Sequence, residues 1–404
     1  MDHITEPARS TPLAGRYDVI VAGGGVAGVA AALAAARSGA RTALLEREYL
    51  LGGLGTLGLI AIYLPVCDGR GHLVTTGIAE ELLRLSIRQG SEGRRPAAWL
   101  DGGDDAARQK QRFEVQYNPW LFAIDCEEAL RQAGVRLVYG CTVCGAVREG
   151  DAVTALLAET RDGRQAWAAR AFVDAGGSAD LFAAAGCPTA LHAGGNSLAS
   201  WYYLADKTGV RLRQLGFLDV PENDTELDRD VQKGDLHGAG GYHGMTAEDL
   251  TRMTMDAHAA LKADFLAGGP LAPDHRPVAI AAIPQLRMTR RLAGAATPDE
   301  IPFASCEDSI GLAADWRRRG PVFELPYGSL YSPGCQNLFA AGRCISVTDA
   351  LWDVTRVIPS CALTGQAAGT AAALTARAGR RAAAAELQDA LRAAGVLLHP
   401  DFAP

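Results

Sequence analysis

The 404-residue sequence has no block of basic residues and no long uninterrupted apolar run. It has 39 Lys and Arg against 46 Asp and Glu, a formal net charge of −7, so nucleic acid or an anionic membrane is not an expected partner. Three consecutive glycines interrupt the most apolar stretch, residues 17–46, and the apolar parts on either side are too short for a membrane span. There is no internal repeat.

Cysteine is scattered through the chain, and its number, nine, is odd. This argues against a disulfide framework and predicts a reducing, cytoplasmic location. Cys141 and Cys144 have the spacing of a redox pair, but they fall in a predicted strand, so two cysteines in a sheet is the simpler interpretation. Residues 1–16 have no apolar segment and are expected to form a flexible tail, not a signal peptide. We predict no metal site.

The strongest signal in the sequence is a glycine turn between a predicted strand and a predicted helix. Residues 17–22 form an apolar run that suits a buried parallel strand. The glycines of a G-x-G-x-x-G pattern follow as Gly23, Gly25 and Gly28. In this pattern the first glycine permits a tight turn, the second lets the backbone approach a pyrophosphate, and the third lets the helix pack closely on the strand.

The residues after the turn complete a dinucleotide-binding unit. The helix that follows consists almost entirely of Ala, Val and Leu, and its N-terminus, with Val26 and Ala27, would present N–H groups to a phosphate. Residues 41–45 predict a second strand. Glu46, followed by Arg47, falls at about the spacing where a carboxylate binds a ribose hydroxyl. A glycine turn in another kind of α/β protein would leave Glu46 unexplained.

A second glycine cluster, residues 51–58, follows the acid and indicates backbone that passes close to a ligand. The succession of glycine turn, acid and GG-containing loop resembles FAD-dependent oxidoreductases with the glutathione-reductase-type FAD fold. In that family the acid holds the adenosine ribose. The second loop, here with Gly53 and Thr56, lies along the pyrophosphate or the flavin. An NAD(P) reductase would not need this loop.

Later segments resemble the same family. The strand at 171–178 ends in Asp-Ala-Gly-Gly, like the second signature of the family, which implies a cofactor contact at Gly176. Near 337–343 a strand runs into Gly342. Many members have an Asp next, which binds the ribityl chain, but this sequence has Arg343, so Asp349 is an alternative for that contact.

Residues 356–372 resemble the closing helix of the family, whose N-terminus faces the flavin and stabilises negative charge on it. The resemblance assigns Gly365, Gln366 and Ala367 to the cofactor. It covers residues 17–58, 171–178 and 337–373, and is strongest to flavoproteins related to fumarate reductase and thiazole synthase. The implied cofactor is FAD.

The expected fold class is α/β, with a Rossmann-like FAD-binding domain that contains a parallel sheet and a β-meander, and a smaller α+β substrate or cap domain. We expect the FAD-binding domain to comprise residues 17–190 and 331–404. The substrate or cap domain would comprise residues 191–330, which lack the regular alternation of strand and helix and carry Gly- and His-rich loops.

The favoured function is an FAD-dependent oxidoreductase that oxidises a C–H bond next to an alcohol or amine of a small polar metabolite by hydride transfer to flavin N5. Such a reaction needs a base, and His243, His237 and His72 are the candidates. Each of them can equally be a loop histidine with structural hydrogen bonds.

An arginine cluster, Arg287, Arg290 and Arg291, follows an apolar run, and its guanidinium groups suit a substrate carboxylate, although some must form structural ion pairs. Arg356, Tyr63 and His237 are further candidates for substrate binding. His237 is thus a candidate both for substrate binding and for catalysis.

Three alternatives remain open. A reductase of an activated double bond would use an arginine, here Arg290, as proton donor. An NAD(P)-dependent enzyme would use only the first motif, and a non-enzymatic flavin-binding protein is the third alternative. The sequence has one full glycine fingerprint, so the expected electron acceptor is oxygen, a quinone or a partner protein. It has no Trp-x-Trp-x-Ile-Pro signature of flavin halogenases. Homo-oligomer formation is left open.

Overall fold

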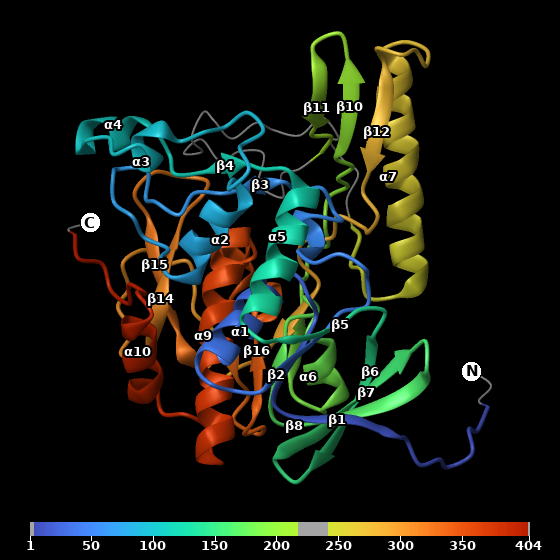
Figure 1. Cartoon of the computed structure of the whole chain (residues 1–404), viewed down its shortest axis with the longest axis vertical. Coiled ribbons are helices and arrows are strands. Elements are labelled where there is room, and N and C mark those ends of the chain that lie inside the picture. Colours follow the sequence, from blue (N-terminus) through green and yellow to red (C-terminus); the bar gives the residue numbers. More distant parts are fainter. Residues whose placement is uncertain (1–3, 217–240, 403–404) are drawn as a thin grey trace.

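The computed structural model describes residues 4–216 and 241–402, and its largest sheet has seven strands (Figure 1). Five of them are parallel, with the spatial order β5 (Arg136–Val138), β2 (Thr42–Leu45), β1 (Leu13–Ala22), β8 (Gly163–Asp174) and β16 (Leu338–Ala340). Residues 19–21 of β1 are fully buried, as expected for a parallel strand that is covered on both faces.

Strand β8 belongs to two parts of the sheet. Its first half pairs antiparallel with β7 (Ala152–Thr160), which pairs in turn with β6 (Thr142–Glu149), and its second half pairs with β16. The predicted parallel sheet and β-meander are therefore confirmed. Strand β1 begins four residues earlier than predicted, because residues 13–17 also pair with β8.

Two helices cover the parallel sheet and lie against each other, α1 (Val26–Arg37) and α9 (Ile358–Ala378). Their backbones approach closely, since a Cβ on Gly365 would lie 2.2 Å from the carbonyl oxygen of Ala27. Residues 26–35 of α1 are all buried, which explains the Ala-rich composition of this helix.

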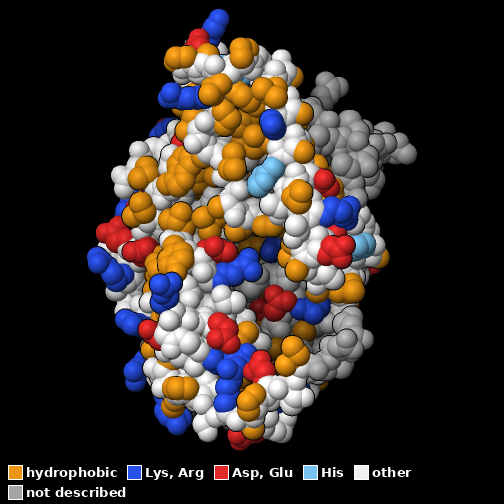
Figure 2. Space-filling view, turned by 90° about the vertical axis from the view of Figure 1, so that its right-hand side faces the viewer, with side chains coloured by type: hydrophobic (Ala, Val, Ile, Leu, Met, Phe, Trp, Pro, Cys, Tyr) orange, Lys and Arg blue, Asp and Glu red, His pale blue; other side chains and the backbone are white. Residues whose placement is uncertain are grey.

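An arm extends from the top of the molecule in the view of Figure 1. It contains a three-stranded antiparallel sheet, β11 (Gly209–Arg213), β10 (Tyr202–Asp206) and β12 (Arg276–Ile280), beside the long helix α7 (Ala247–Ala267). Figure 2 shows hydrophobic side chains gathered on the upper part of the face that carries α7. The exposed apolar residues of the arm include Met255, Leu266, Leu271, Val278 and Ile280.

The remaining elements connect these parts. The helices are α2 (Ile78–Ser86), α3 (Ala97–Leu100), α4 (Asp105–Lys110), α5 (Pro119–Gln132), α6 (Asp180–Ala184), α8 (Asp349–Thr355) and α10 (Ala384–Ala393). The strands are β3 (Ile62–Tyr63), β4 (Val115–Gln116), β9 (Thr189–Leu191), β13 (Arg290–Leu292), β14 (Ser309–Ala314) and β15 (Val322–Pro326). Within the described ranges, no helix has the length and apolar character needed to cross a bilayer.

Candidate active site

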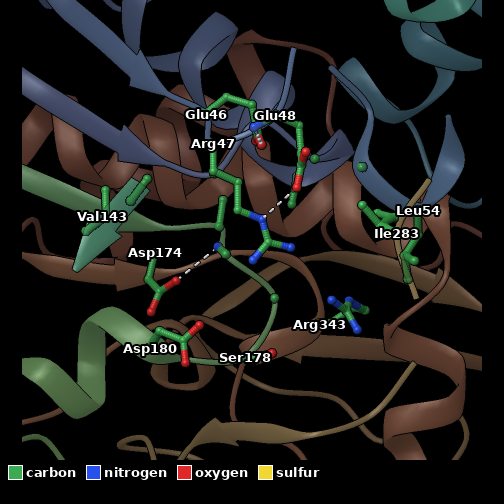
Figure 3. Close-up of a pocket in the computed structure, with 18 of the residues that line it drawn as sticks. Glu46, Arg47, Glu48, Leu54, Val143, Asp174, Ser178, Asp180, Ile283 and Arg343 are labelled. Carbon is green, nitrogen blue, oxygen red and sulfur yellow. Dashed lines mark hydrogen bonds and ion pairs between the residues drawn. The ribbon is translucent and has the colours of Figure 1, made fainter. Parts of the chain in front are cut away.

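A cavity of about 600 Å³ lies at the carboxyl ends of β1, β2 and β8, beside the N-terminus of α1 (Figure 3). Its lining includes the last residues of β1, β2 and β8, which are Ala22, Leu45 and Asp174. Ligands of open α/β sheets bind at this edge, where the strands end. We call this space the dinucleotide cavity.

The glycine turn forms one wall of the dinucleotide cavity through its backbone. A Cβ on Gly25, the N-cap of α1, would have no heavy atom within 4 Å, so it would project into open space. A Cβ on Gly28 would instead lie 1.9 Å from the carbonyl oxygen of Gly23, so this glycine serves the packing of helix on turn. Helix α1 has no side-chain cap and no acid in its first turn, which leaves its positive end to a ligand.

Glu46, the acid after β2, lies against the glycine turn. Glu46 is 8% exposed, and its carboxylate accepts hydrogen bonds from the backbone N–H of Gly24 and, at 2.8 Å, from that of Glu48. Arg47 also lines the cavity and forms an ion pair with Glu48 at 3.2 Å (Figure 3). The carboxylate is thus fixed at the cavity wall, and its contact with a ribose stays a prediction.

Arg343 lies across the cavity from Glu46 (Figure 3). Its Nη1 donates to the backbone carbonyls of Leu286, at 2.6 Å, and Arg287, at 2.9 Å. Burial lowers the pKa of the Arg343 guanidinium below its ordinary value. A half-buried cation held by neutral carbonyls suits an anionic group such as a phosphate.

Asp174 organises the loop that passes under the cavity. Its carboxylate accepts backbone N–H groups of Gly176, at 3.0 Å, and Leu181, at 2.9 Å. Burial raises the pKa of this carboxyl to about 6. The predicted contact residue Gly176 lines the cavity together with Ser178.

The closing helix contributes residues of its first turn to the cavity, together with Arg356, the C-cap of α8. Arg356, Ile358 and Cys361 line the dinucleotide cavity, and the N-cap of α9, Val357, has no side-chain cap. The N-terminus of α9 therefore faces the same space as that of α1. Among the predicted cofactor residues, those that line the cavity are Gly23, Gly25, Val26, Ala27, Glu46, Arg47, Gly53, Gly176 and Arg343.

Three predicted cofactor residues lie two turns inside α9 and do not line the cavity. Gly365 contacts the backbone of α1, and Ala367 is fully buried. The side-chain oxygen of Gln366 accepts the backbone N–H of Ile78 at 2.8 Å, at the start of α2. The motif locates the helix correctly, but the helix begins at Ile358, so the residues at its N-terminus precede the GQA sequence.

Gly342 and Thr56 also lie behind the cavity lining. The N–H of Gly342 donates to Thr364 Oγ1 at 3.0 Å, and its positive φ of 76° explains the glycine. The Thr56 hydroxyl donates to the carbonyl of Leu51 and so holds the second glycine loop in shape. Cys141 and Cys144 lie at the edge of the cavity, at the start of β6. Burial raises the pKa of the Cys141 thiol to about 11, which opposes a reactive thiolate.

A second cavity, of about 390 Å³, adjoins the first, and we call it the arginine cavity. The one residue common to the described linings of both cavities is Arg356. The described lining of the arginine cavity contains Glu114 and six arginines, Arg94, Arg112, Arg211, Arg213, Arg287 and Arg356. Its apolar residues are Ile60, Ile62, Leu64, Trp201, Leu212 and Trp316.

The predicted base histidines lie elsewhere. His243 is exposed and does not line either cavity, although its neighbour Gly244 lines the dinucleotide cavity. The His72 Nδ1 lies 2.7 Å from an oxygen of Asp68, its ring stacks on Phe402, and it lines neither cavity. His237 lies outside the described residues.

Two further predicted site residues have structural partners. Arg290 donates to the carbonyl of Ser178 at 2.9 Å and pairs with Asp180. Both partners line the dinucleotide cavity, but Arg290 itself lines neither cavity. Tyr63 is fully buried, and its hydroxyl donates to the carbonyl of Ala79 at 2.6 Å. Of the predicted substrate residues in the described chain, Arg287 and Arg356 are the two that line the arginine cavity.

A family model described as FAD dependent oxidoreductase matches residues 18–200 and 307–392, more than half of the chain. The chain belongs to this family. The unmatched residues between these segments include β10–β12, α7 and Arg287. The predicted cofactor, FAD, and the prediction of an oxidoreductase are therefore confirmed.

Solved structures of low sequence identity are also similar to this flavoenzyme. One is the p-nitrophenol 4-monooxygenase PnpA of Pseudomonas putida DLL-E4, with 13% identity, 93% of this chain and 84% of that chain covered, and a TM-score of 0.50. A second is a geranylgeranyl bacteriochlorophyll reductase-like protein of Thermoplasma acidophilum, with 13% identity, coverage of 94% and 82%, and a TM-score of 0.47. A third is the 3-ketosteroid-Δ4-(5α)-dehydrogenase of Rhodococcus jostii RHA1, with 14% identity, coverage of 90% and 98%, and a TM-score of 0.42.

The groups that line the dinucleotide cavity of this flavoenzyme suit the parts of FAD, independently of the family match. Its walls offer two helix N-termini without side-chain caps, an open Cα at Gly25, the carboxylate of Glu46 and the cation of Arg343. A helix N-terminus and an arginine suit a pyrophosphate, and a carboxylate suits a ribose hydroxyl.

Sequence reasoning missed four of the six arginines, Arg94, Arg112, Arg211 and Arg213. The first two lie in loops, in segments without any motif. Arg211 and Arg213 carried a readable signal, because residues i and i+2 of a strand point to the same face.

Proposed function

We propose that this flavoenzyme oxidises a C–H bond next to an alcohol or amine of a small polar metabolite that binds in the arginine cavity. The observation that carries the proposal is that one residue, Arg356, lines both the dinucleotide cavity and the arginine cavity. When bound, FAD supplies a hydride acceptor at N5. A substrate in the arginine cavity would meet the cofactor at this shared wall.

The residues of the dinucleotide cavity would hold the cofactor in place. The N-terminus of α1 and Arg343 would bind the pyrophosphate, and Glu46 would bind the adenosine ribose. Arg356 donates to the carboxylate of Asp353, one turn earlier, and this ion pair orients its guanidinium at the junction of the two cavities.

Glu114 is the residue that we assign to proton removal from the substrate. It is the acidic side chain in the described lining of the arginine cavity, whereas His72 and His243 line neither cavity. Arg94 Nη1 lies 2.7 Å from its carboxylate, which fixes the position of the base. A positioned carboxylate can take an alcohol proton as hydride leaves the adjacent carbon.

Reduction of an activated double bond is the second candidate. The set of arginines in the described lining favours it, because an arginine rather than a histidine or carboxylate would then deliver the proton. Arg356 replaces Arg290 as the donor in this case, since Arg290 lies outside both linings. The electron acceptor, the cytoplasmic location and homo-oligomer formation stay predictions.

Anaerobic mixing of the FAD-loaded protein with a panel of hydroxy acids, amino acids and neutral alcohols tests the two candidates. Bleaching of the flavin by one of these donors supports the oxidation. If no donor bleaches the flavin, but an enoate reoxidises the chemically reduced protein, the reduction is the correct function. A flavin that responds to neither treatment contradicts both.

The Glu114→Gln variant sharpens this test. We expect flavin reduction by the active donor to be about 100-fold slower or more, with an unchanged flavin spectrum, because a general base contributes roughly 10²–10⁴-fold. Glu80→Gln, on the surface of α2, is the matched control and should react like the original protein. Equal rates for both variants would remove Glu114 from the mechanism.

A further inference from the structure

We infer that the arginine cavity binds an organic carboxylate with an apolar body, and that Arg287 is the residue that anchors the carboxylate. The inference rests on the proposed function, because it names the substrate class of the same site. It depends on three features: the rigidity of Arg287, the apolar surface beside it, and the place of Arg287 next to the dinucleotide cavity.

Arg287 is held firmly at its backbone. Its N–H donates to the side-chain oxygen of Asn196 at 2.9 Å, and its carbonyl accepts a hydrogen bond from Arg343 at 2.9 Å. The residue is only 4% exposed, and its side chain lines the arginine cavity. The Nη1 of Arg287 also donates to the carbonyl of Gln285 at 3.4 Å, and the planar fork of a guanidinium matches the two oxygens of a carboxylate.

Other arginines of the lining are oriented by carboxylates. Arg213 lies 2.7 Å from Asp264. Arg211 lies 2.6 Å from Asp206, and neither aspartate belongs to the described lining. These pairs fix guanidinium groups at the cavity wall. The described lining itself contains six arginines and one carboxylate, Glu114, which gives it a basic character. Such a wall attracts an anion and disfavours a substrate whose only charge is a cation.

The rest of the lining supplies an apolar surface. The indole nitrogen of Trp316 donates to the carbonyl of Asp353 at 3.0 Å, and that of Trp201 to the carbonyl of Gly216 at 3.3 Å. Because both indole N–H groups have a backbone partner, the rings offer apolar surface to the cavity together with the aliphatic residues of β3 and its neighbours. A volume of about 390 Å³ is suited to a small metabolite.

The segment 283–287 forms part of the partition between the cavities. Ile283, Pro284 and Leu286 line the dinucleotide cavity, whereas Arg287 lines the arginine cavity. A carboxylate bound to Arg287 is therefore anchored by the residue that follows Leu286, a residue of the dinucleotide cavity lining. The carbon atoms next to that carboxylate would lie toward the junction at Arg356, where the proposed reaction takes place.

Isothermal titration calorimetry of the FAD-loaded protein tests the inference with benzoate as the probe. Benzyl alcohol and benzamide have a similar shape but no charge, and we expect them to bind about 10-fold more weakly or worse, because charge-assisted bidentate contacts are lost. Arg287→Gln should weaken benzoate binding by about 10-fold or more at unchanged flavin content. Arg84→Gln, a surface variant on α2, is the control and should bind benzoate like the original protein.

The outcomes separate this inference from the proposed function. Equal binding of benzoate and benzyl alcohol, absence of benzoate binding, or an Arg287→Gln variant with full benzoate affinity would each overturn the inference. If Arg287→Gln fails to fold, Arg287→Lys takes its place, because lysine keeps the charge but loses the bidentate fork, and weaker benzoate binding is again the expected result. Flavin that is bleached by a neutral alcohol, in a protein that does not bind benzoate, keeps the proposed function and refutes the carboxylate.

Discussion

The two cavities of this flavoenzyme are built from different parts of the chain. Glycine turns and the N-termini of two helices contribute to the lining of the dinucleotide cavity, whereas arginines and large apolar residues line the arginine cavity. The first type of wall depends on local sequence, because a glycine turn and the helix after it are contiguous. The second depends on tertiary folding, which brings together arginines between positions 94 and 356.

The largest effect is expected from a change that breaks the scaffold of the dinucleotide cavity. In Gly365→Val, the new Cβ would lie 2.2 Å from the carbonyl oxygen of Ala27, so α9 must move away from α1. We expect a loss of about 3 kcal/mol or more in the free energy of unfolding, as for severe overpacking, together with loss of FAD. Thermal unfolding and flavin content measure both effects.

Gly334→Val is the control for this change, because a Cβ at Gly334 has no heavy atom within 4 Å. It should unfold at nearly the same temperature as the original protein and keep its flavin. A Gly365→Val variant with the stability of this control would show that the α1–α9 contact does not support the cavity.

The next effect concerns the loop under the cavity and depends on pH. The pKa of Asp174 is about 6 in the folded protein and about 3.9 in an unfolded chain. The folded state therefore holds its proton more tightly, and the stability from this group is present below pH 4 and lost as the pH rises through 6. The loss amounts to at most roughly 3 kcal/mol.

Asp174→Asn removes this titration. Chemical unfolding of both proteins between pH 4 and pH 7 should show that the original protein loses stability relative to the variant as the pH rises. Parallel pH profiles, or a relative gain for the original protein, would contradict the buried carboxyl as the cause.

The smallest effect is expected at His243. This side chain is exposed and lines neither cavity, so His243→Ala should change the rate of flavin reduction by less than about twofold, as expected for a surface residue outside the site. The comparison with Glu114→Gln, measured with the same donor, tells whether Glu114 or His243 supplies the base. A tenfold slower His243→Ala variant would return the histidine to the mechanism.

The contrast between local and tertiary signals explains what the sequence could predict. The turn at Gly23 to Gly28, the acid Glu46 and the parallel sheet follow from contiguous patterns, and the structure has them as predicted. For α9 the motif identified the helix but not its first residue. Gln366, expected at the cofactor, therefore lies in the helix interior, where its side chain bonds the start of α2.

The arginine cavity was only partly predictable. Arg287 and Arg356 stood out through a basic cluster and a position before the closing helix. Arg94 and Arg112 lie in segments without a repeating pattern, and only folding places them beside β11 and Arg287. The chemistry of histidine predicts a base but not its position, and neither His72 nor His243 lies in a cavity lining.

The flavin stoichiometry of purified Gly25→Val tests most directly that a backbone-lined cavity holds the cofactor. A Cβ at this position has open space around it, so the FAD-free variant should fold with the melting temperature of the Gly334→Val control after its FAD has been removed. The account predicts a near-total loss of bound FAD in Gly25→Val and a full complement in the control, because the side chain would fill the place where the pyrophosphate approaches the turn. A full complement of FAD in Gly25→Val would contradict it.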